Sequence, residues 1–354
     1  MKKEIGTVAS GAKQDRAKRT HRSKAEAGPS VAGFRLPEMP EALRKLLGPK
    51  PMIRYSHQAA LKLFENLGWK FEVRHLGESR LGLLRWPLRK MGPGAIPRRL
   101  VMVPGFGDTP LSWWSVLAGL KPVLKREVDE VILIDYPGYC GFLHDEPAFD
   151  SMDELMRVFR EIVGSLKPEV LVGHSLGAWL AADFAIERPE TVRKLYLVDP
   201  GGLVTTEEDR ANYRGLFATA IESGPDHLLP HVFAKAPVWL PFFQTEFFSF
   251  LKTPEVRAFV ASFDDRHLLN DRVGKIRAET TILWGDRDTL TPVKWIEQWL
   301  ERLPADLKKQ GILIRGSGHS PQLEKPGVVI ALFTQLFLGR ELKNLALVPL
   351  WKVV

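Results

Sequence analysis

The stretch Val170-Leu-Val-Gly-His-Ser175-Leu-Gly177 decides which fold to expect of this chain. An apolar run of β-strand character leads into Gly-x-Ser-x-Gly, and the helix-forming sequence Ala178-Trp-Leu-Ala-Ala follows at once. This pattern predicts a sharp turn between a strand and a helix, with the Ser175 hydroxyl exposed at the turn. Gly173 and Gly177 leave room where a side chain would clash, and Ser175 is expected to adopt a strained backbone conformation.

Two further motifs follow the serine along the chain. Thr281-Ile-Leu-Trp-Gly285-Asp-Arg-Asp288-Thr-Leu-Thr-Pro292 places an acid after a strand-like run, and Ile312-Leu-Ile-Arg-Gly-Ser-Gly318-His319 places a histidine after another. Serine, then aspartate, then histidine is the chain order of the α/β-hydrolase triad.

The sequence resembles the α/β-hydrolase superfamily, in its serine esterase and lipase-like branch, over about residues 70–340. Gly285 to Pro292 matches the Gly-x-x-Asp-x-x-x-Pro motif of that branch, and Gly316 to Pro326 matches Gly-x-Gly-His-x-x-x-x-Glu-x-Pro. The resemblance implies an α/β fold: a mostly parallel eight-stranded sheet flanked by helices, with a helical cap inserted before the acid-bearing strand. Serine at position 175 argues against the epoxide-hydrolase and haloalkane-dehalogenase branches, which have aspartate there.

A glycine-rich loop upstream resembles the oxyanion loop of the family. It reads Leu100-Val-Met-Val-Pro104-Gly105-Phe106-Gly107-Asp108, with Pro104 where histidine is common. The resemblance implies that the backbone N–H groups of Phe106 and Leu176 bind the oxyanion. Because the donor is a backbone group, the proline need not abolish the oxyanion hole, although it can alter how the loop is braced.

The triad assigns a role to each side chain. His319 would accept the proton of Ser175, and Asp288 would orient the imidazole and stabilise its positive charge. Asp286 and Asp199, the latter at the end of another strand, are alternative acids; Asp286 is expected to support its turn. His174 is expected to pack under the serine turn. This chemistry needs no metal and no organic cofactor.

Length and composition fit one large α/β domain with appendages. The chain has 354 residues, of which 45% are hydrophobic and 26% charged, which is enough for a well-buried core. Cys140 is the single cysteine, so no intramolecular disulfide forms. Cysteine usage of this kind indicates either a reducing compartment, hence a cytoplasmic location, or a fold that needs no disulfides.

The N-terminus is rich in lysine and arginine and has no apolar run after it, so it predicts a basic, mobile arm rather than a signal peptide or a membrane span. The arm contributes much of the formal net charge of +8. A solvated arm is one interpretation, and peripheral contact with an anionic membrane surface is the other. No nucleic-acid recognition motif accompanies the charge. The basic residues are Lys2, Lys3, Lys13, Arg16, Lys18, Arg19, Arg22 and Lys24.

The pattern predicts five regions: a basic arm (1–40), an N-terminal helical extension (41–69), an α/β core (70–202 and 276–340), a helical cap (203–275) and an apolar tail (341–354). Alternation of strand-like and helical segments indicates a mostly parallel sheet covered on both faces. Residues 328–338 predict the closing helix, and the tail is expected to dock on the body or on a partner. The eight expected strands are 71–76, 81–86, 100–103, 131–134, 170–172, 195–198, 281–283 and 312–314.

Phenylalanine is concentrated in the expected cap, which holds nine of the 19 in the chain. Trp239, Phe242, Phe243 and Phe247 belong to the densest cluster. These rings either form the core of the cap or line an apolar substrate pocket. An apolar pocket favours a fatty or aromatic ester.

Three functional hypotheses follow. The first is a serine hydrolase that cleaves a hydrophobic carboxylic ester through an acyl-enzyme intermediate. The second, within the same fold, is a C–C bond hydrolase, a cofactor-free haloperoxidase or an acyltransferase. The third is a non-catalytic small-molecule receptor, since fold does not settle function. Polar or cationic cap side chains facing the nucleophile would favour the C–C hydrolase.

Overall fold

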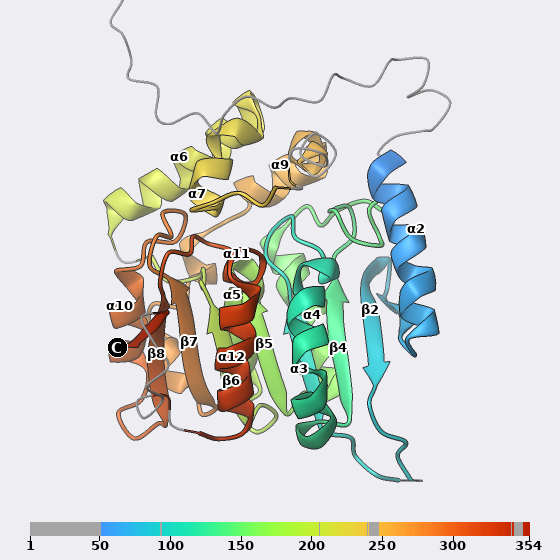
Figure 1. The fold of residues 1–354 in the computed structure, drawn as a ribbon. Coiled ribbons are helices and arrows are strands. Elements are labelled where there is room, and N and C mark those ends of the chain that lie inside the picture. Colours follow the sequence, from blue (N-terminus) through green and yellow to red (C-terminus); the bar gives the residue numbers. More distant parts are fainter. Residues whose placement is uncertain are drawn as a thin grey trace, which may run out of the picture. The chain divides into compact units, whose positions relative to one another are not determined.

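Nine strands form one sheet in the computed structural model, which describes residues 51–92, 94–204, 206–238, 240, 248–340, 342 and 350–354 (Figure 1). The order across the sheet is β1-β2-β4-β3-β5-β6-β7-β8-β9. Neighbours from β4 to β8 pair in parallel, whereas the β1–β2, β2–β4 and β8–β9 pairs are antiparallel. The strands are β1 (Lys70–Leu76), β2 (Ser79–Pro87), β3 (Arg99–Val103), β4 (Glu130–Asp135), β5 (Val170–His174), β6 (Lys194–Val198), β7 (Glu279–Gly285), β8 (Lys309–Ile314) and β9 (Trp351–Val353).

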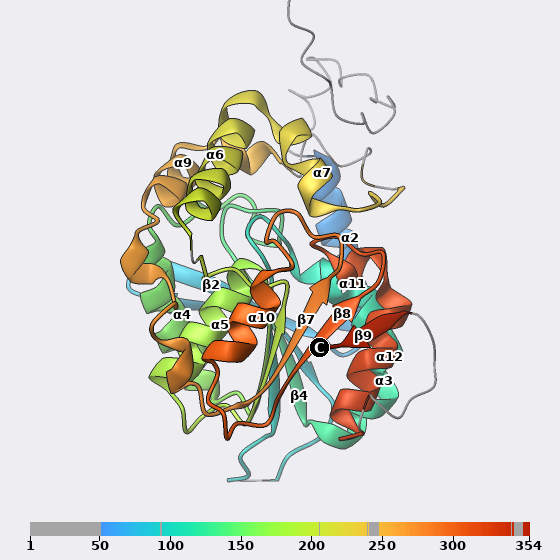
Figure 2. The ribbon, with the colours of Figure 1, turned by 90° about the vertical axis from the view of Figure 1, so that its left-hand side faces the viewer.

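Both faces of the sheet are buried, which explains why its strands are continuous apolar runs. On β3, Val101 and Val103 face one core with residues of α4 and α5, while Leu100 and Met102 face the other with residues of α3 and α12. Figure 2 shows the two layers on either side of the sheet. The helices outside the cap are α2 (Pro51–Asn66), η1 (Pro110–Trp113), α3 (Trp114–Glu127), α4 (Met152–Leu166), α5 (Leu176–Glu187), α10 (Trp295–Arg302), α11 (Pro321–Glu324) and α12 (Pro326–Phe337).

Helices fill much of the chain between β6 and β7 and lie over the carboxyl ends of the parallel strands (Figure 2). Threonines start two of them, because the Thr206 side chain accepts a hydrogen bond from the Asp209 N–H and Thr253 does the same for Val256. All described residues belong to one compact unit. The helices of this segment are α6 (Glu207–Ser223), η2 (Pro225–His227), α7 (Leu229–Val232), η3 (Ser249–Lys252), α9 (Pro254–Ala261), η4 (Asp265–His267) and η5 (Val273–Lys275).

All eight expected strands are present, but the predicted strand number was one too low. The additional strand, β9, lies in the apolar tail and pairs with β8, with Val353 opposite Ile312. Three residues are too few for a recognisable alternating pattern, and their strand conformation depends on an edge strand that lies distant in sequence. Trp351 and Val353 pack against the core, so this part of the tail docks on the body.

The closing helix, α12, begins and ends near the predicted bounds. Residues 1–50, which include the basic arm, lie outside the described residues, as do Trp239 and residues 241–247 of the predicted aromatic pocket and residues 343–349 of the tail. The five predicted region boundaries stay predictions.

Candidate active site

Ser175 occupies the turn between β5 and α5 in the conformation that the motif predicts. Its φ is 54° and its ψ is −116°, which is a strained backbone for a residue with a side chain. A Cβ on Gly173 would lie 2.3 Å from the carbonyl oxygen of Gly177, and one on Gly177 would lie 2.3 Å from that of Val103. Both glycines are therefore required for β5, α5 and β3 to approach this closely.

The position of the turn in the sheet suits a binding site. The loop after β3 contains Phe106, and β3 lies between β4 and β5, where the order of the strands reverses. Open parallel sheets bind ligands outside the carboxyl ends of strands at such a point. Ser175, Phe106 and His319 line one cavity of about 70 Å³ there, which we call the serine cavity.

His319 and Asp288 form a buried pair in the loops after β8 and β7. The Nδ1 atom of His319 lies 2.8 Å from Oδ2 of Asp288. The other ring nitrogen, Nε2, is buried and has no hydrogen-bond partner among the described residues. Hence the imidazole is oriented by the carboxylate on one side, and its second nitrogen is available toward the serine cavity.

Hydrogen bonds hold the Asp288 carboxylate in its charged form. Oδ1 accepts from the N–H groups of Leu290 (2.8 Å) and Thr291 (3.0 Å), and Oδ2 accepts from the Thr291 hydroxyl (2.6 Å). Burial alone would raise the pKa of Asp288, but the charge of His319 and the bonds from His319 and Thr291 together hold this pKa below its ordinary value. Sequence reasoning missed Thr291, although aspartate commonly bonds to backbone N–H groups shortly after it, which marks this turn.

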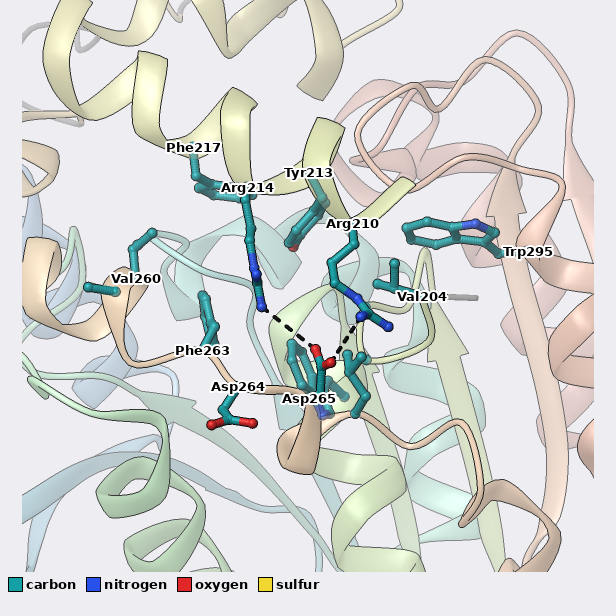
Figure 3. Close-up of a pocket in the computed structure, with 15 residues that line it drawn as sticks. Val204, Arg210, Tyr213, Arg214, Phe217, Val260, Phe263, Asp264, Asp265 and Trp295 are labelled. Carbon is teal, nitrogen blue, oxygen red and sulfur yellow. Dashed lines mark hydrogen bonds and ion pairs between the residues drawn. The ribbon is translucent and has the colours of Figure 1, made fainter. Parts of the chain in front are cut away.

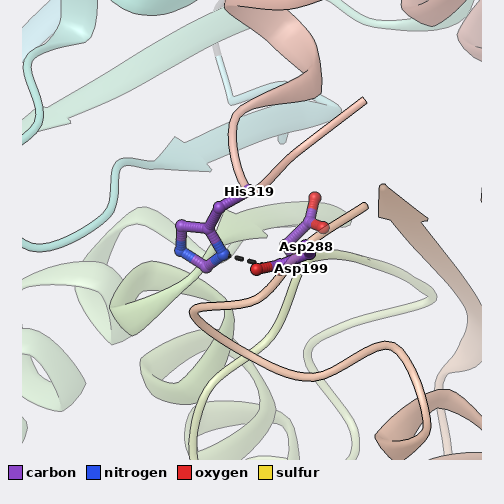
Figure 4. A group of neighbouring side chains, drawn as sticks. All are labelled: Asp199, Asp288 and His319. Atoms are coloured by element: carbon purple, nitrogen blue, oxygen red, sulfur yellow. Dashed lines mark hydrogen bonds and ion pairs between the residues drawn. The ribbon is translucent and has the colours of Figure 1, made fainter. Parts of the chain in front are cut away.

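Asp199 is an alternative acid that the sequence offers. Its side chain lies close to Asp288 and His319, but the imidazole bonds to Asp288 and not to Asp199 (Figure 4). The Asp199 side chain accepts from the Gly285 N–H at 2.8 Å. Burial, followed by the negative charge of Asp288, raises the pKa of Asp199 well above its ordinary value. Asp286 instead accepts from the Gly316 N–H at 2.7 Å, so it joins its turn to the loop that carries His319 rather than bonding within its own turn as expected. Asp288 is thus the acid that contacts His319.

One oxygen or nitrogen atom from each of Asp199, Asp288 and His319 lies within 4.8 Å of the others. A metal ion would need these atoms as ligands, yet the Asp288 oxygens already accept hydrogen bonds and burial favours the protonated form of Asp199. We therefore assign no metal to this group.

His174, directly before the serine, packs under the turn as predicted. Its Nε2 lies 2.7 Å from the carbonyl oxygen of His319 and must donate to it, and its Nδ1 lies 3.3 Å from the side-chain amide nitrogen of Gln322. The Asp108 carboxylate lies 3.6 Å from the same Nδ1. His174 thereby links the loop that contains Phe106 to the loop that contains His319.

The His319 loop is also bound to the chain between β6 and β7. The His319 N–H donates to the carbonyl of Val232 at 3.0 Å. Glu324 accepts from the N–H groups of Gly318 (2.8 Å) and Lys235 (3.0 Å). These bonds explain the glutamate of the histidine motif, because it ties the loop to the cap segment.

Phe106 lies at the tip of a tight turn in which the Asp108 N–H donates to the Gly105 carbonyl at 3.2 Å. The Asp108 carboxylate accepts from the Thr109 N–H (2.8 Å) and the Ser112 hydroxyl (3.0 Å). These bonds brace the loop that carries Pro104 in place of histidine. Leu176 is the first residue of α5, where N–H groups point out of the helix end.

The cap covers the serine cavity with apolar side chains. The four aromatic residues expected there, Trp239, Phe242, Phe243 and Phe247, lie outside the described residues. Among the described residues, those that the cap contributes are all apolar, and they include Phe217, Leu228, Val232, Phe233, Phe248 and Phe250. Their individual positions were missed because a phenylalanine count does not show which rings face the nucleophile.

Comparison with known proteins identifies the class to which this fold and site belong. Residues 100–332 match the model of the alpha/beta hydrolase family. The chain belongs to this family, and it is an enzyme of the hydrolase class.

The chain is similar to a monoacylglycerol lipase, abhd6-B, of Xenopus laevis, with 24% identity over 68% of this chain and 75% of the relative. It is also similar to the 2-hydroxy-6-oxononadienedioate/2-hydroxy-6-oxononatrienedioate hydrolase of Comamonas testosteroni, with 27% identity over 62% and 80%. Among solved structures, a putative lipase from Acinetobacter baumannii superposes with a TM-score of 0.61 and 20% identity, over 80% of this chain and 96% of that one. A membrane phospholipase A gives 0.59 and 20%, over 84% and 94%. At these identities the structures support the fold alone.

None of the described helices has the length and apolar character needed to cross a membrane.

Proposed function

We propose that the protein is a serine hydrolase that cleaves a hydrophobic carboxylic ester through an acyl-enzyme intermediate. The observation that carries the proposal is the convergence on one apolar cavity of a serine on a strained turn and a histidine held by a buried carboxylate. The name of the Xenopus relative, a monoacylglycerol lipase, agrees with it.

In this mechanism the Ser175 hydroxyl attacks the ester carbonyl while Nε2 of His319 accepts its proton. Asp288 stabilises the imidazolium that forms. The N–H groups of Phe106 and Leu176 bind the oxyanion, each donor contributing roughly 3–4 kcal/mol to the transition state. His319 then protonates the leaving alcohol, and a water molecule, activated by the same imidazole, releases the acid from Ser175.

A C–C bond hydrolase is the second candidate, because the Comamonas relative carries that kind of name. The described cap residues of the serine cavity are apolar, whereas cationic side chains facing the nucleophile would have favoured C–C cleavage. Arg210 and Arg214 lie in a neighbouring cavity, where both pair with Asp265. The apolar lining of the serine cavity therefore favours cleavage of an ester over cleavage of a C–C bond.

Hydrolysis of p-nitrophenyl esters of increasing acyl length tests the proposal. Ser175→Ala should lower turnover by up to about a million-fold, and Ser165→Ala, on α4, serves as the matched control. A fluorophosphonate should form a bond between phosphorus and Ser175 Oγ with release of fluoride, seen as an added mass in the wild type and Ser165→Ala but not in Ser175→Ala. If wild type and Ser175→Ala hydrolyse every ester equally slowly and neither is labelled, the proposal fails.

We propose in addition that the protein contacts anionic membrane surfaces peripherally. The first 50 residues hold 12 of the 50 Lys and Arg residues and 5 of the 42 Asp and Glu residues, so they carry +7 of the net charge of +8. The helix that follows, α2, exposes Tyr55 (53%), Leu63 (51%) and, just beyond its end, Leu67 (43%). Basic residues near an anionic lipid surface contribute about 1 kcal/mol each.

Co-sedimentation with vesicles tests this contact. The protein should bind phosphatidylserine-containing vesicles, and added salt should release it. Replacing Lys18, Arg19, Arg22 and Lys24 by glutamine should weaken binding, and so should Leu63→Gln. Equal binding to vesicles of phosphatidylcholine alone would contradict the charge argument.

A further inference from the structure

A second, larger cavity adjoins the serine cavity under the cap. It measures about 360 Å³, against about 70 Å³ for the serine cavity. Pockets that hold organic ligands usually measure about 300–1,000 Å³. The serine cavity alone is therefore too small for a hydrophobic ester, whereas the larger cavity, which we call the cap chamber, is large enough.

One face of α6 forms a wall of the cap chamber. Arg210, Tyr213, Arg214 and Phe217 follow one another at helical spacing and project toward it (Figure 3). Val260 and Phe263, on and just after α9, lie on the opposite side. The wall thus changes along α6 from an aromatic end at Phe217 to a charged end at Arg210.

The charged end is neutralised within the protein. Arg210 pairs with Glu207 at 2.8 Å and with Asp265 at 2.9 Å, and Arg214 pairs with Asp265 at 3.6 Å. Asp264 lines the chamber as well, so two lining carboxylates, Asp264 and Asp265, face the two lining arginines. An uncharged apolar chain suits this chamber better than an anionic ligand.

The inner end of the cap chamber comes close to the backbone of the serine turn. Gly201 lines the chamber, and its N–H donates to the Ser175 carbonyl at 3.2 Å. Burial and then the charge of Asp288 raise the pKa of Tyr213, so this lining hydroxyl stays uncharged.

Phe217 is the residue that lines both cavities in the described part of the chain. Its ring lies edge-on to Phe106 of the oxyanion loop, with centroids 5.7 Å apart, and 5.0 Å from the ring of Tyr213. A rotation of this side chain would join the two cavities.

We infer that the cap chamber is the binding site for the acyl chain of an uncharged ester, and that Phe217 is the partition that must move before a long chain enters. This inference rests on the proposed esterase function and adds to it a residue that determines specificity. A short acyl group fits the serine cavity with Phe217 in place, and a long one requires the chamber.

Acyl-length profiles of three variants test the partition. Phe217→Ala should raise the ratio of kcat/KM for dodecanoate over acetate by about tenfold, and Phe217→Trp should lower it by a similar factor. Val260→Trp, which fills the chamber from α9, should also lower it. Leu216→Ala, next in sequence but lining neither cavity, should leave the ratio unchanged. A lower ratio in Phe217→Ala, or an unchanged one in Val260→Trp, would overturn the inference.

A binding measurement separates this inference from the proposed reaction. The methyl ester of ω-bromododecanoic acid is added to Ser175→Ala, and the bromine quenches tryptophans that the chain contacts. Trp295 lines the cap chamber, whereas Trp299, one turn further along α10, lines neither cavity. Saturable quenching that falls in Trp295→Phe but not in Trp299→Phe supports the chamber even if no ester is hydrolysed. If quenching is the same in Trp295→Phe and Trp299→Phe, or if the ester quenches no tryptophan, the chain does not occupy the cap chamber, and the inference is refuted even if esters are hydrolysed.

Discussion

The His319 imidazole is bound to Asp288 through Nδ1 at 2.8 Å, and the carboxylate accepts three further bonds from Leu290 and Thr291. The imidazole therefore has one orientation and one tautomer, with the proton on Nδ1 and the lone pair on Nε2. The general base that we propose for Ser175 needs that lone pair.

Asp288→Asn should lower kcat for p-nitrophenyl esters by about ten-thousand-fold, because an amide can donate to Nδ1 and stabilise the wrong tautomer. KM should change little. Asp286→Asn is the matched control, since its amide oxygen still accepts from the Gly316 N–H. If both variants lose activity equally, Asp288 has no special role.

Asp199→Asn should retain activity and gain stability at neutral pH. The folded-state pKa of Asp199 is raised by burial and by Asp288. As pH rises above about 4, the Asp199 carboxyl loses its proton in the unfolded chain but keeps it in the folded protein. The free energy of unfolding of the wild type therefore falls as pH rises from about 4 toward the raised folded-state pKa. The asparagine variant lacks this loss. Its melting temperature should exceed that of the wild type at pH 8, with the gap closing toward pH 4; a constant gap contradicts the assignment.

The sequence predicted the eight main strands and the Ser175, Asp288 and His319 positions because each depends on local chemistry. Each of the three residues follows an apolar strand and lies in a glycine-containing turn, so the same short motif predicts both the turn and the site residue. Gln322 and Glu324 hold the loops of the site through contacts between distant segments, and only the glutamate belongs to a motif. Such contacts depend on how the loops fold back, which periodicity does not report.

The cap chamber is hidden from sequence for a related reason. Its walls come from α5, α6, α9, the segment after α9 and the start of α10, and the order in which Phe217, Tyr213 and Arg210 line it depends on the rotation of α6. The low amphipathicity of α6 gives little indication of that rotation. Strand β9 was not predicted because its partner, β8, lies far from it in the sequence.

Gly177→Ala and Gly215→Ala should shift stability in opposite directions. The added methyl at position 177 would meet the Val103 carbonyl at 2.3 Å, so β3 and α5 must move apart and little folded protein is expected. Position 215, within α6, has no atom within 4 Å of the added methyl, and alanine there should stabilise by about 0.5–1 kcal/mol. Circular dichroism melts of both variants check this. A well-folded, active Gly177→Ala would contradict the close approach of the two elements.

His57 should make stability depend on pH through the docking of α2. The imidazole is buried, and its ring centroid lies 5.1 Å from that of Phe142 and 5.6 Å from that of His144. Burial, followed by His144, lowers the pKa of His57 from 6.5 to about 4. In that window the unfolded chain binds a proton that the folded chain does not, so stability is present above pH 6.5 and is lost as pH falls toward 4.

The full effect is up to about 3 kcal/mol, since each unit of pKa is equivalent to about 1.4 kcal/mol. Urea unfolding at pH 7.5 and pH 5 measures it. His57→Leu should remove most of the difference between the two pH values, whereas His75→Gln, at an exposed position on β1, should keep it. If His57→Leu retains the wild-type difference, the acid sensitivity originates elsewhere and α2 is not held by a neutral imidazole.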